Sequence, residues 1–393
     1  MMKRCLTLLA AAAATWLAGA LPAQAAGVTD KEIVVGSMLD LSGPAAAGMP
    51  QLRNGMQLRI DEANATGGVH GRKIRLVVED NAGTPQQAVR VAQKLIRQDG
   101  VFATINNFGS GPGAATVKAI SDAGVVNFAP WATSGTLHQI SANSPLLFTV
   151  VQNYNTSSAY GLSWALKNWG SKKVGTIIME GPFGELMKAG VASAMQAAGL
   201  TLAAEASYKP GEIDFSSHVA RMKAAGVDTI FAGTIVRETI GVMAEVKKLG
   251  WTDVKVLTGL GGRNSTVVML GKDAVDGLYG IAGWSLPHTV ANDPAARRFA
   301  DAYRKAFNME PDETASNAYS YADWFIAVLQ AAGPNLDAQS FAKAAPGVSH
   351  QDFTTFAKLS LKDNHVSPEM VGIDVVKGGR WEPLVAPFTG MVK

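Results

Sequence analysis

Ile33-Val34-Val35-Gly36 opens the alternation of short β-branched runs and helical patterns that decides the fold of this 393-residue chain. A short, apolar, β-branched run predicts a buried strand. The helical pattern of residues 51–65 follows it, with a regular apolar face. Strands joined by helices of about 10 to 15 residues form βαβ units, so we expect a parallel sheet.

The alternation reaches residue 129 and then starts again near residue 173. The predicted strands cover residues 33–36, 74–79, 102–105, 125–129, 173–179, 201–208, 229–231 and 255–258. Two similar series predict two Rossmann-like α/β lobes with parallel sheets. A length well above that of one ordinary domain agrees with two lobes. The helical stretch 294–332 is too long for a connector, and we expect it to pack back on one lobe.

The first 25 residues have the pattern of a secretory signal. A cationic start, an apolar run over residues 6–21 and the small-residue site Ala23-Gln24-Ala25 predict cleavage near Ala26. A membrane anchor would need about 20 apolar residues, and this run is shorter. We therefore expect a protein that is free in the periplasm.

Composition restricts the chemistry of the exported chain. The only cysteine, Cys5, lies within the signal and too early for a lipoprotein, so thiol nucleophiles, disulfides and thiolate metal sites are excluded together. Loss of Lys3 and Arg4 leaves 33 basic against 32 acidic residues. Such neutrality argues against nucleic acid or an anionic membrane as partner.

Enzyme signatures are weak in this sequence. The six histidines lack metal-ligand spacing, and no serine lies in a G-x-S-x-G elbow. The sequence does not exclude a pair of carboxylates of the kind that glycosidases use, although no such pair stands out on the predicted cleft loops. We expect no metal and no cofactor, and an exported α/β enzyme is the second class considered.

The loop after the third predicted strand is the first candidate site. Residues 109–114 match G-x-G-x-x-A at the start of a helix. The next strand ends at Trp131 without the carboxylate that would hold a ribose, so a dinucleotide is not expected. The Ser110 hydroxyl, Phe108 beside it and free N–H groups at a helix start instead favour a carboxylate ligand.

The loop after the fourth predicted strand repeats this arrangement with Trp131, Ala132 and Thr133. Thr133 or Ser134 can cap the next helix, which is compatible with binding because other N–H groups still face outward. Trp131, between a proline and small residues, is a good stacking platform for a ligand. We expect it to contact the ligand at the edge where these loops converge.

Two loops of the second series complete the candidate site. Phe183 precedes a helix, where it serves either as a hydrophobic staple or as a wall of the cleft. Gly261 and Arg263 lie on a glycine-rich loop after the eighth predicted strand. An exposed arginine is usually solvated, yet on a cleft loop it can form a bidentate clamp on a carboxylate.

The exported chain resembles the periplasmic solute-binding proteins of ABC importers, specifically the leucine/isoleucine/valine-binding family. The resemblance is carried by several strings. These are Ile33-Val34-Val35-Gly36, Leu41-Ser42-Gly43-Pro44, the stretch N-x-x-G-G-V-H-G-R-K-I of residues 64–74, Val78-Glu79-Asp80-Asn81, Asp122-Ala123-Gly124-Val125, Pro130-Trp131-Ala132-Thr133 and Asp214-Phe215-Ser216.

This resemblance implies a type I periplasmic binding protein whose two lobes are joined by a three-crossover hinge and close over the ligand. On this basis we expect residues 26–151 and 285–357 in lobe 1 and residues 152–284 and 358–393 in lobe 2. The ligand carboxylate would be held by Ser110 and the loop of Trp131 and Thr133, and Phe183 would touch the ligand. The partners implied are a small-molecule carboxylate and an ABC permease, with the receptor a monomer.

The departures from that family bear on the ligand. Gly261 stands where the amino-acid receptors carry an acid for the ligand ammonium, and Gly48 stands in place of a tryptophan. An unpaired ammonium in a closed cleft would be costly. We expect a carboxylate without an α-ammonium, such as an aromatic or other apolar acid. A branched-chain or other amino-acid receptor is the alternative, because Glu180 or Glu238 can supply the charge.

Overall fold

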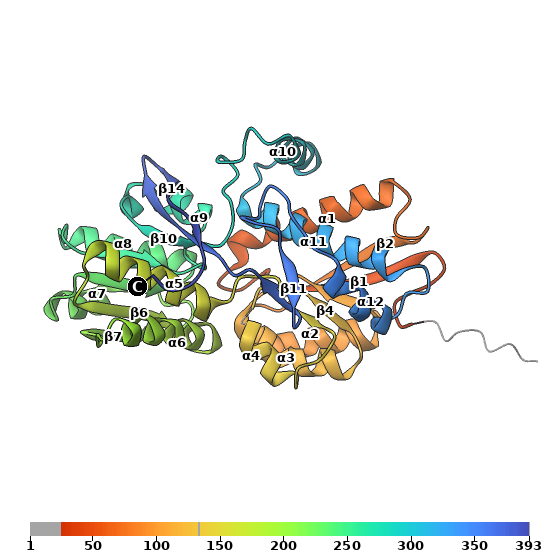
Figure 1. Ribbon diagram of the computed structural model, residues 1–393, viewed down its shortest axis with the longest axis horizontal. Helices are drawn as coiled ribbons and strands as arrows, with labels where there is room; N and C mark the ends of the chain where they lie inside the picture. The colour runs from red at the N-terminus through yellow and green to blue at the C-terminus, as the bar shows by residue number, and fades with distance from the viewer. Residues whose placement is uncertain (1–24, 133, 393) are drawn as a thin grey trace, which may run out of the picture.

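The computed structural model describes residues 25–132 and 134–392, which form two α/β lobes side by side (Figure 1). The first lobe contains a five-stranded parallel sheet of order β2-β1-β3-β4-β5. Its strands are β1 (Glu32–Leu39), β2 (Lys73–Asp80), β3 (Ala103–Ile105), β4 (Val126–Phe128) and β5 (Leu147–Phe148). Seven of the eight β1 residues are buried, as expected of a parallel strand covered on both faces.

The second lobe contains a seven-stranded sheet of order β14-β13-β10-β9-β8-β6-β7. The parallel strands are β6 (Val174–Met179), β7 (Ala204–Tyr208), β8 (Thr229–Gly233), β9 (Lys255–Thr258) and β10 (Tyr279–Ala282). The C-terminal strands β13 (Val371–Lys377) and β14 (Arg380–Phe388) add to this sheet in antiparallel orientation. The predicted two-lobed α/β architecture is confirmed, and this antiparallel edge was not predicted.

Helices cover the faces of both sheets (Figure 1). In the first series they are α1 (Met49–Ala65), α2 (Pro85–Arg97), α3 (Ser110–Asp122) and α4 (Ser134–Ile140). The second series has α5 (Tyr154–Trp169), α6 (Pro182–Ala197), α7 (Ser216–Ala224), α8 (Val236–Lys248) and α9 (Ser265–Gly271). Thr84 caps α2 and Pro85 occupies its first turn, which explains why this helix begins there.

The predicted helical stretch 294–332 consists of two helices, α10 (Pro294–Phe307) and α11 (Glu313–Ala332). The first ends at Asn308, which adopts the left-handed conformation that terminates helices. As expected, the stretch packs on the first lobe, because the rings of Trp324 and Phe325 lie 6.1 and 5.6 Å from that of Phe128. The short helix α12 (Ala338–Ala344) follows on the same lobe (Figure 1).

The chain crosses between the sheets after β5, after β10 and again before β13. Before the last crossing it forms the small hairpin β11 (Ser360–Lys362) and β12 (His365–Ser367). Leu359, Leu361 and Val366 belong to the hydrophobic core of the first sheet. Because their packing places them with lobe 1, we propose that the third crossover follows residue 366 rather than residue 357.

The predicted signal segment and one site residue fall largely outside this description. Residues 1–24 and Thr133 are not among the described residues. Over residues 25–132 and 134–392, no helix is both long and apolar enough to cross a membrane.

Candidate functional site

The two predicted loops of the first lobe lie next to each other at the carboxyl ends of β3 and β4. Phe108 and Trp131 form a parallel backbone bridge. The Trp131 N–H donates to the Asn107 carbonyl at 2.7 Å, and the Gly109 N–H donates to the Trp131 carbonyl at 3.0 Å. Backbone bonds therefore hold Phe108, Ser110 and Trp131 within one small region, as the topology predicts.

Ser110 is the first residue of α3 and is buried, with 7% of its surface exposed. Gly109 before it has φ of 105°, a conformation that glycine adopts without strain. A Cβ at Gly113 would lie 2.9 Å from the Ala132 Cβ, so this glycine lets α3 approach the Trp131 loop closely. The first-turn N–H groups of α3 and its dipole can stabilise a carboxylate at this position.

Trp131 is half-buried in an aromatic group that spans the edge of the first lobe. Its ring lies 6.4 Å from Phe108, 6.0 Å from Tyr321 and 6.4 Å from Trp284. The indole N–H donates to Asn106 Oδ1 at 2.8 Å, which fixes the orientation of the ring. The sequence analysis named Trp131 as a site residue, but it did not name its neighbours Asn106, Tyr321 and Trp284.

Phe183 and Gly261 meet in the second lobe. Phe183 packs edge-on against Tyr154, with ring centroids 5.1 Å apart, and is 6% exposed. A Cβ at Gly261 would lie 3.0 Å from Phe183 Cζ and 3.1 Å from the Thr234 carbonyl oxygen. A side chain at position 261 would therefore require the Phe183 ring and the Thr234 carbonyl to shift by a few tenths of an ångström. Burial raises the pKa of Tyr154 to about 12, so its hydroxyl stays neutral.

Arg263, predicted as a clamp for the ligand carboxylate, is buried in the second lobe. Its guanidinium is 1% exposed and already paired, with Nε and Nη2 donating to Asp374 Oδ2 at 2.8 and 2.5 Å. Nη2 also donates to the Trp284 carbonyl at 3.2 Å. Asp374 reaches Arg263 because β13 pairs with β10, which places the carboxylate across from Gly280. Arg263 therefore forms a buried ion pair within the second lobe, and its role as a clamp on a ligand carboxylate stays a prediction.

The two alternative acids occupy different environments. Glu180 is exposed and accepts a hydrogen bond from Ser207 Oγ at 3.3 Å. Glu238, at the start of α8, is 1% exposed, and burial raises its pKa. Within the part of the chain that the structure describes, Glu238 Oε2 has no hydrogen-bond partner. Glu238 is therefore the acid better placed to respond to a polar or cationic group.

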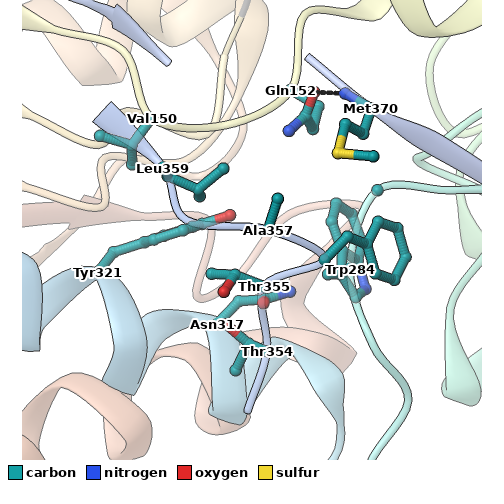
Figure 2. Close-up of a pocket in the computed structure, with 12 residues that line it drawn as sticks. Val150, Gln152, Trp284, Asn317, Tyr321, Thr354, Thr355, Ala357, Leu359 and Met370 are labelled. Carbon is teal, nitrogen blue, oxygen red and sulfur yellow. Dashed lines mark hydrogen bonds between the residues drawn. The ribbon is translucent and has the colours of Figure 1, made fainter. Parts of the chain in front are cut away.

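A small, partly open cavity of about 20 Å³ lies where the crossovers meet (Figure 2). It is lined by Val150, Gln152, Gly283, Trp284, Asn317, Tyr321, Thr354, Thr355, Phe356, Ala357, Leu359 and Met370. Gln152 Oε1 accepts a hydrogen bond from the Met370 N–H at 3.0 Å, which joins the first and third crossovers (Figure 2). Trp284 connects this hinge region to Trp131.

Metal binding has no support among residues 25–132 and 134–392. No group of three or more histidine, aspartate or glutamate side chains in those ranges is arranged to hold a metal ion.

The two α/β lobes and their three crossovers define a two-lobed solute-binding protein. Residues 32–380 match the family model described as periplasmic binding protein, and the chain belongs to this family. Several curated relatives that it resembles are named Leu/Ile/Val-binding proteins. The family is one of binding proteins, and the curated relatives are likewise named as binding proteins rather than enzymes.

Two curated relatives illustrate the similarity. The Leu/Ile/Val-binding protein BraC3 of Rhizobium johnstonii is 27% identical over 80% of this chain and 83% of its own. The leucine-, isoleucine-, valine-, threonine-, and alanine-binding protein of Pseudomonas aeruginosa is 26% identical over 69% of this chain and 70% of its own.

Solved structures share the fold at lower identity. A fatty acid ABC transporter substrate-binding protein from Thermomonospora curvata has a TM-score of 0.83 and 23% identity, covering 93% of this chain and 95% of its own. A solute-binding protein from Rhodopseudomonas palustris in complex with 3,4-dihydroxybenzoic acid has a TM-score of 0.80 and 22% identity, covering 92% and 98%. The branched-chain amino acid binding protein LivJ from Streptococcus pneumoniae, in complex with isoleucine, has a TM-score of 0.78 and 24% identity, covering 91% and 100%.

Proposed function

We propose that this periplasmic binding protein captures a small carboxylate without an α-ammonium and delivers it to an ABC permease. The observation that carries the proposal is the contact around Gly261. A Cβ there would meet Phe183 and the Thr234 carbonyl, so an acidic partner for an ammonium does not fit without rearrangement. The closed cleft would then favour an aromatic or other apolar body.

In the proposed mechanism, the start of α3 and the Ser110 hydroxyl bind the carboxylate, and Trp131 stacks on the ligand body. Phe183 and Tyr154 cover it from the second lobe when the hinge closes. Only the closed arrangement makes contacts from both lobes, so a ligand shifts the population towards it. Release would follow docking of the closed, monomeric receptor to the permease.

The ligands named for similar structures agree with a carboxylate ligand, but they differ in whether the ligand also carries an ammonium group. Benzoate, 3,4-dihydroxybenzoic acid and isoleucine all carry a carboxylate, and isoleucine alone among them carries an ammonium. The alternative function, a branched-chain amino acid receptor, is favoured by the names of the curated relatives and by the buried carboxyl of Glu238.

Matched ligand pairs test the proposal. Thermal shifts and calorimetric titrations would compare leucine with 4-methylpentanoate and phenylalanine with 3-phenylpropanoate, with benzoate alongside. A ligand that binds only the native state raises the melting temperature. We expect the ammonium-free member of a pair to stabilise the protein more. Stabilisation by leucine or phenylalanine, with none from 4-methylpentanoate, 3-phenylpropanoate or benzoate, would overturn the proposal in favour of the amino-acid receptor.

We further propose that the exported chain begins near Ala26 in the periplasm. Mass spectrometry of the protein from a periplasmic extract would measure its first residue. A chain that retains residues 1–25 would contradict the cleavage.

A further inference from the structure

A buried contact joins the two lobes beside the loop that carries Gly261. Glu313, the first residue of α11, accepts hydrogen bonds from the backbone N–H of Ser265 at 2.5 Å and from the Ser265 hydroxyl. Thr314 Oγ1 accepts a further bond from Asn264 Nδ2 at 3.2 Å. Glu313 is 1% exposed. We call these four residues the interlobe latch.

The two sides of the latch belong to different lobes. Ala318, on the first turns of α11, is part of the core of the first sheet, whereas Val267 and Val268 of α9 are part of the core of the second. Figure 1 places α11 and α9 in separate lobes. Because its two sides belong to different lobes, a hinge opening that separates α11 from α9 would break the latch.

The latch uses strong interactions. Hydrogen bonds that involve an ionised carboxylate are roughly twice as strong as neutral ones, and burial strengthens them further. Opening would replace them with bonds to water. The closed arrangement therefore gains stability from contacts that involve no ligand.

The latch also fixes one end of a proposed ligand loop. Residues 259–265 run from β9 to α9 and carry Gly261 and Arg263. Their far end is held by Glu313 from the first lobe and by the Trp381 indole N–H, which donates to the Asn264 carbonyl at 3.0 Å. Movement of Ser265 would be transmitted along this short loop towards Phe183, which lies against Gly261.

We infer that Glu313 is a positioning residue that raises ligand affinity by holding Ser265 and the closed arrangement of the lobes. This inference rests on the proposed function for its effect on binding. Its effect on the lobes themselves requires no ligand. A receptor whose competent state is less populated binds its ligand more weakly by the same factor.

The lobe arrangement can be measured directly by double electron–electron resonance. A chain that begins near Ala26 contains no cysteine, so spin labels at Ala119→Cys and Ala197→Cys report the distance between α3 and α6. Both alanines are exposed and lie on different lobes. In the ligand-free protein, Glu313→Gln should move the distance distribution towards the open arrangement.

Affinity provides the second measurement, with benzoate and isoleucine as the probes. Glu313→Gln and Ser265→Ala should each weaken the binding of whichever probe the wild-type protein binds by about tenfold. This is the expected effect of losing a hydrogen bond to a charged group. In the double variant the two effects should add less than fully, because both changes act on the contact of Glu313 with Ser265, although Ser265→Ala keeps the backbone N–H that also donates to Glu313. A general loss of structure would not produce this pattern.

Glu310→Gln is the matched control. Glu310 is an exposed carboxylate close by in the chain that pairs with Arg304, so its loss should change neither the distances nor the affinity. Unchanged distance distributions in both Glu313→Gln and Ser265→Ala, with native circular dichroism, would overturn the latch. If neither probe binds the wild-type protein, their choice as ligands fails, and the ligand-free distances still decide the inference.

Discussion

The ligand loops of the two lobes are organised in different ways. In the first lobe, the Phe108 and Trp131 segments are joined by backbone hydrogen bonds between loops that follow neighbouring strands. In the second lobe, the loop of residues 259–265 depends on side chains that are remote in sequence. Asp374 pairs with Arg263, and Glu313 binds Ser265 from the other lobe.

This difference indicates how each half of the cleft is formed. Backbone bonds between adjacent strand ends exist as soon as the first sheet forms, so the proposed carboxylate position is built into one lobe. The loop of the second lobe depends in addition on Asp374 of the C-terminal strand β13 and on Glu313 of the first lobe. We therefore expect the first lobe to present a rigid site and the second to adjust on closure.

The largest predicted effect comes from breaking the remote pair in the second lobe. Arg263→Met leaves the Asp374 carboxylate buried without its partner and should lower the free energy of unfolding by about 3 to 5 kcal/mol. Urea denaturation would measure the change. Arg263→Met combined with Asp374→Leu should cost less, because the unpaired charge is then removed.

The control for this pair is the exposed ion pair of Lys118 and Asp122 in the first lobe, where both side chains are more than 60% exposed. Lys118→Met should change the free energy of unfolding by less than about 1 kcal/mol. An equal effect at both pairs would show that the second lobe does not depend on Arg263 in the way proposed.

The same difference explains what the sequence could predict. The strand at residues 33–36 and the convergence of Ser110 with Trp131 follow from local patterns and from the rule that ligands bind beyond the ends of parallel strands. The pairing of Arg263 with Asp374 joins residues 111 positions apart, and no periodicity connects them. The sequence allowed Phe183 to be either a hydrophobic staple or a wall of the cleft. Its contacts with Tyr154 and Gly261 could be seen only in the structure.

A smaller effect is predicted for the aromatic platform of the first lobe. Trp131→Ala should weaken binding of benzoate or 3-phenylpropanoate by about 1 to 3 kcal/mol, because stacking and burial of the ring are lost. Isothermal titration calorimetry would measure it. Trp131→Phe keeps an aromatic face and should lose less affinity. Equal affinity of wild type and Trp131→Ala would remove Trp131 from the site and weaken the comparison between lobes.

The smallest effect tests whether the first lobe also depends on a remote side-chain pair. The rings of His138 in α4 and His365 in β12 lie 4.0 Å apart, and the Thr149 hydroxyl lies within hydrogen-bond distance of both. Burial, and then the nearby His365, lower the pKa of His138 to about 4. Below its unfolded pKa near 6.5, the unfolded chain takes up a proton that the folded protein resists.

The contribution of His138 to the free energy of unfolding should therefore be fully present above pH 6.5 and should decrease as the pH falls towards 4. With allowance for solvent screening, we expect a loss of about 1 kcal/mol between pH 7 and pH 5, measured by urea denaturation at each pH. His138→Gln should flatten this dependence, whereas His70→Gln, at an exposed histidine, should preserve it. An unchanged pH profile in His138→Gln would mean that the contact between His138 and His365 does not stabilise the first lobe. Dependence on side chains that are remote in sequence would then be a property of the second lobe.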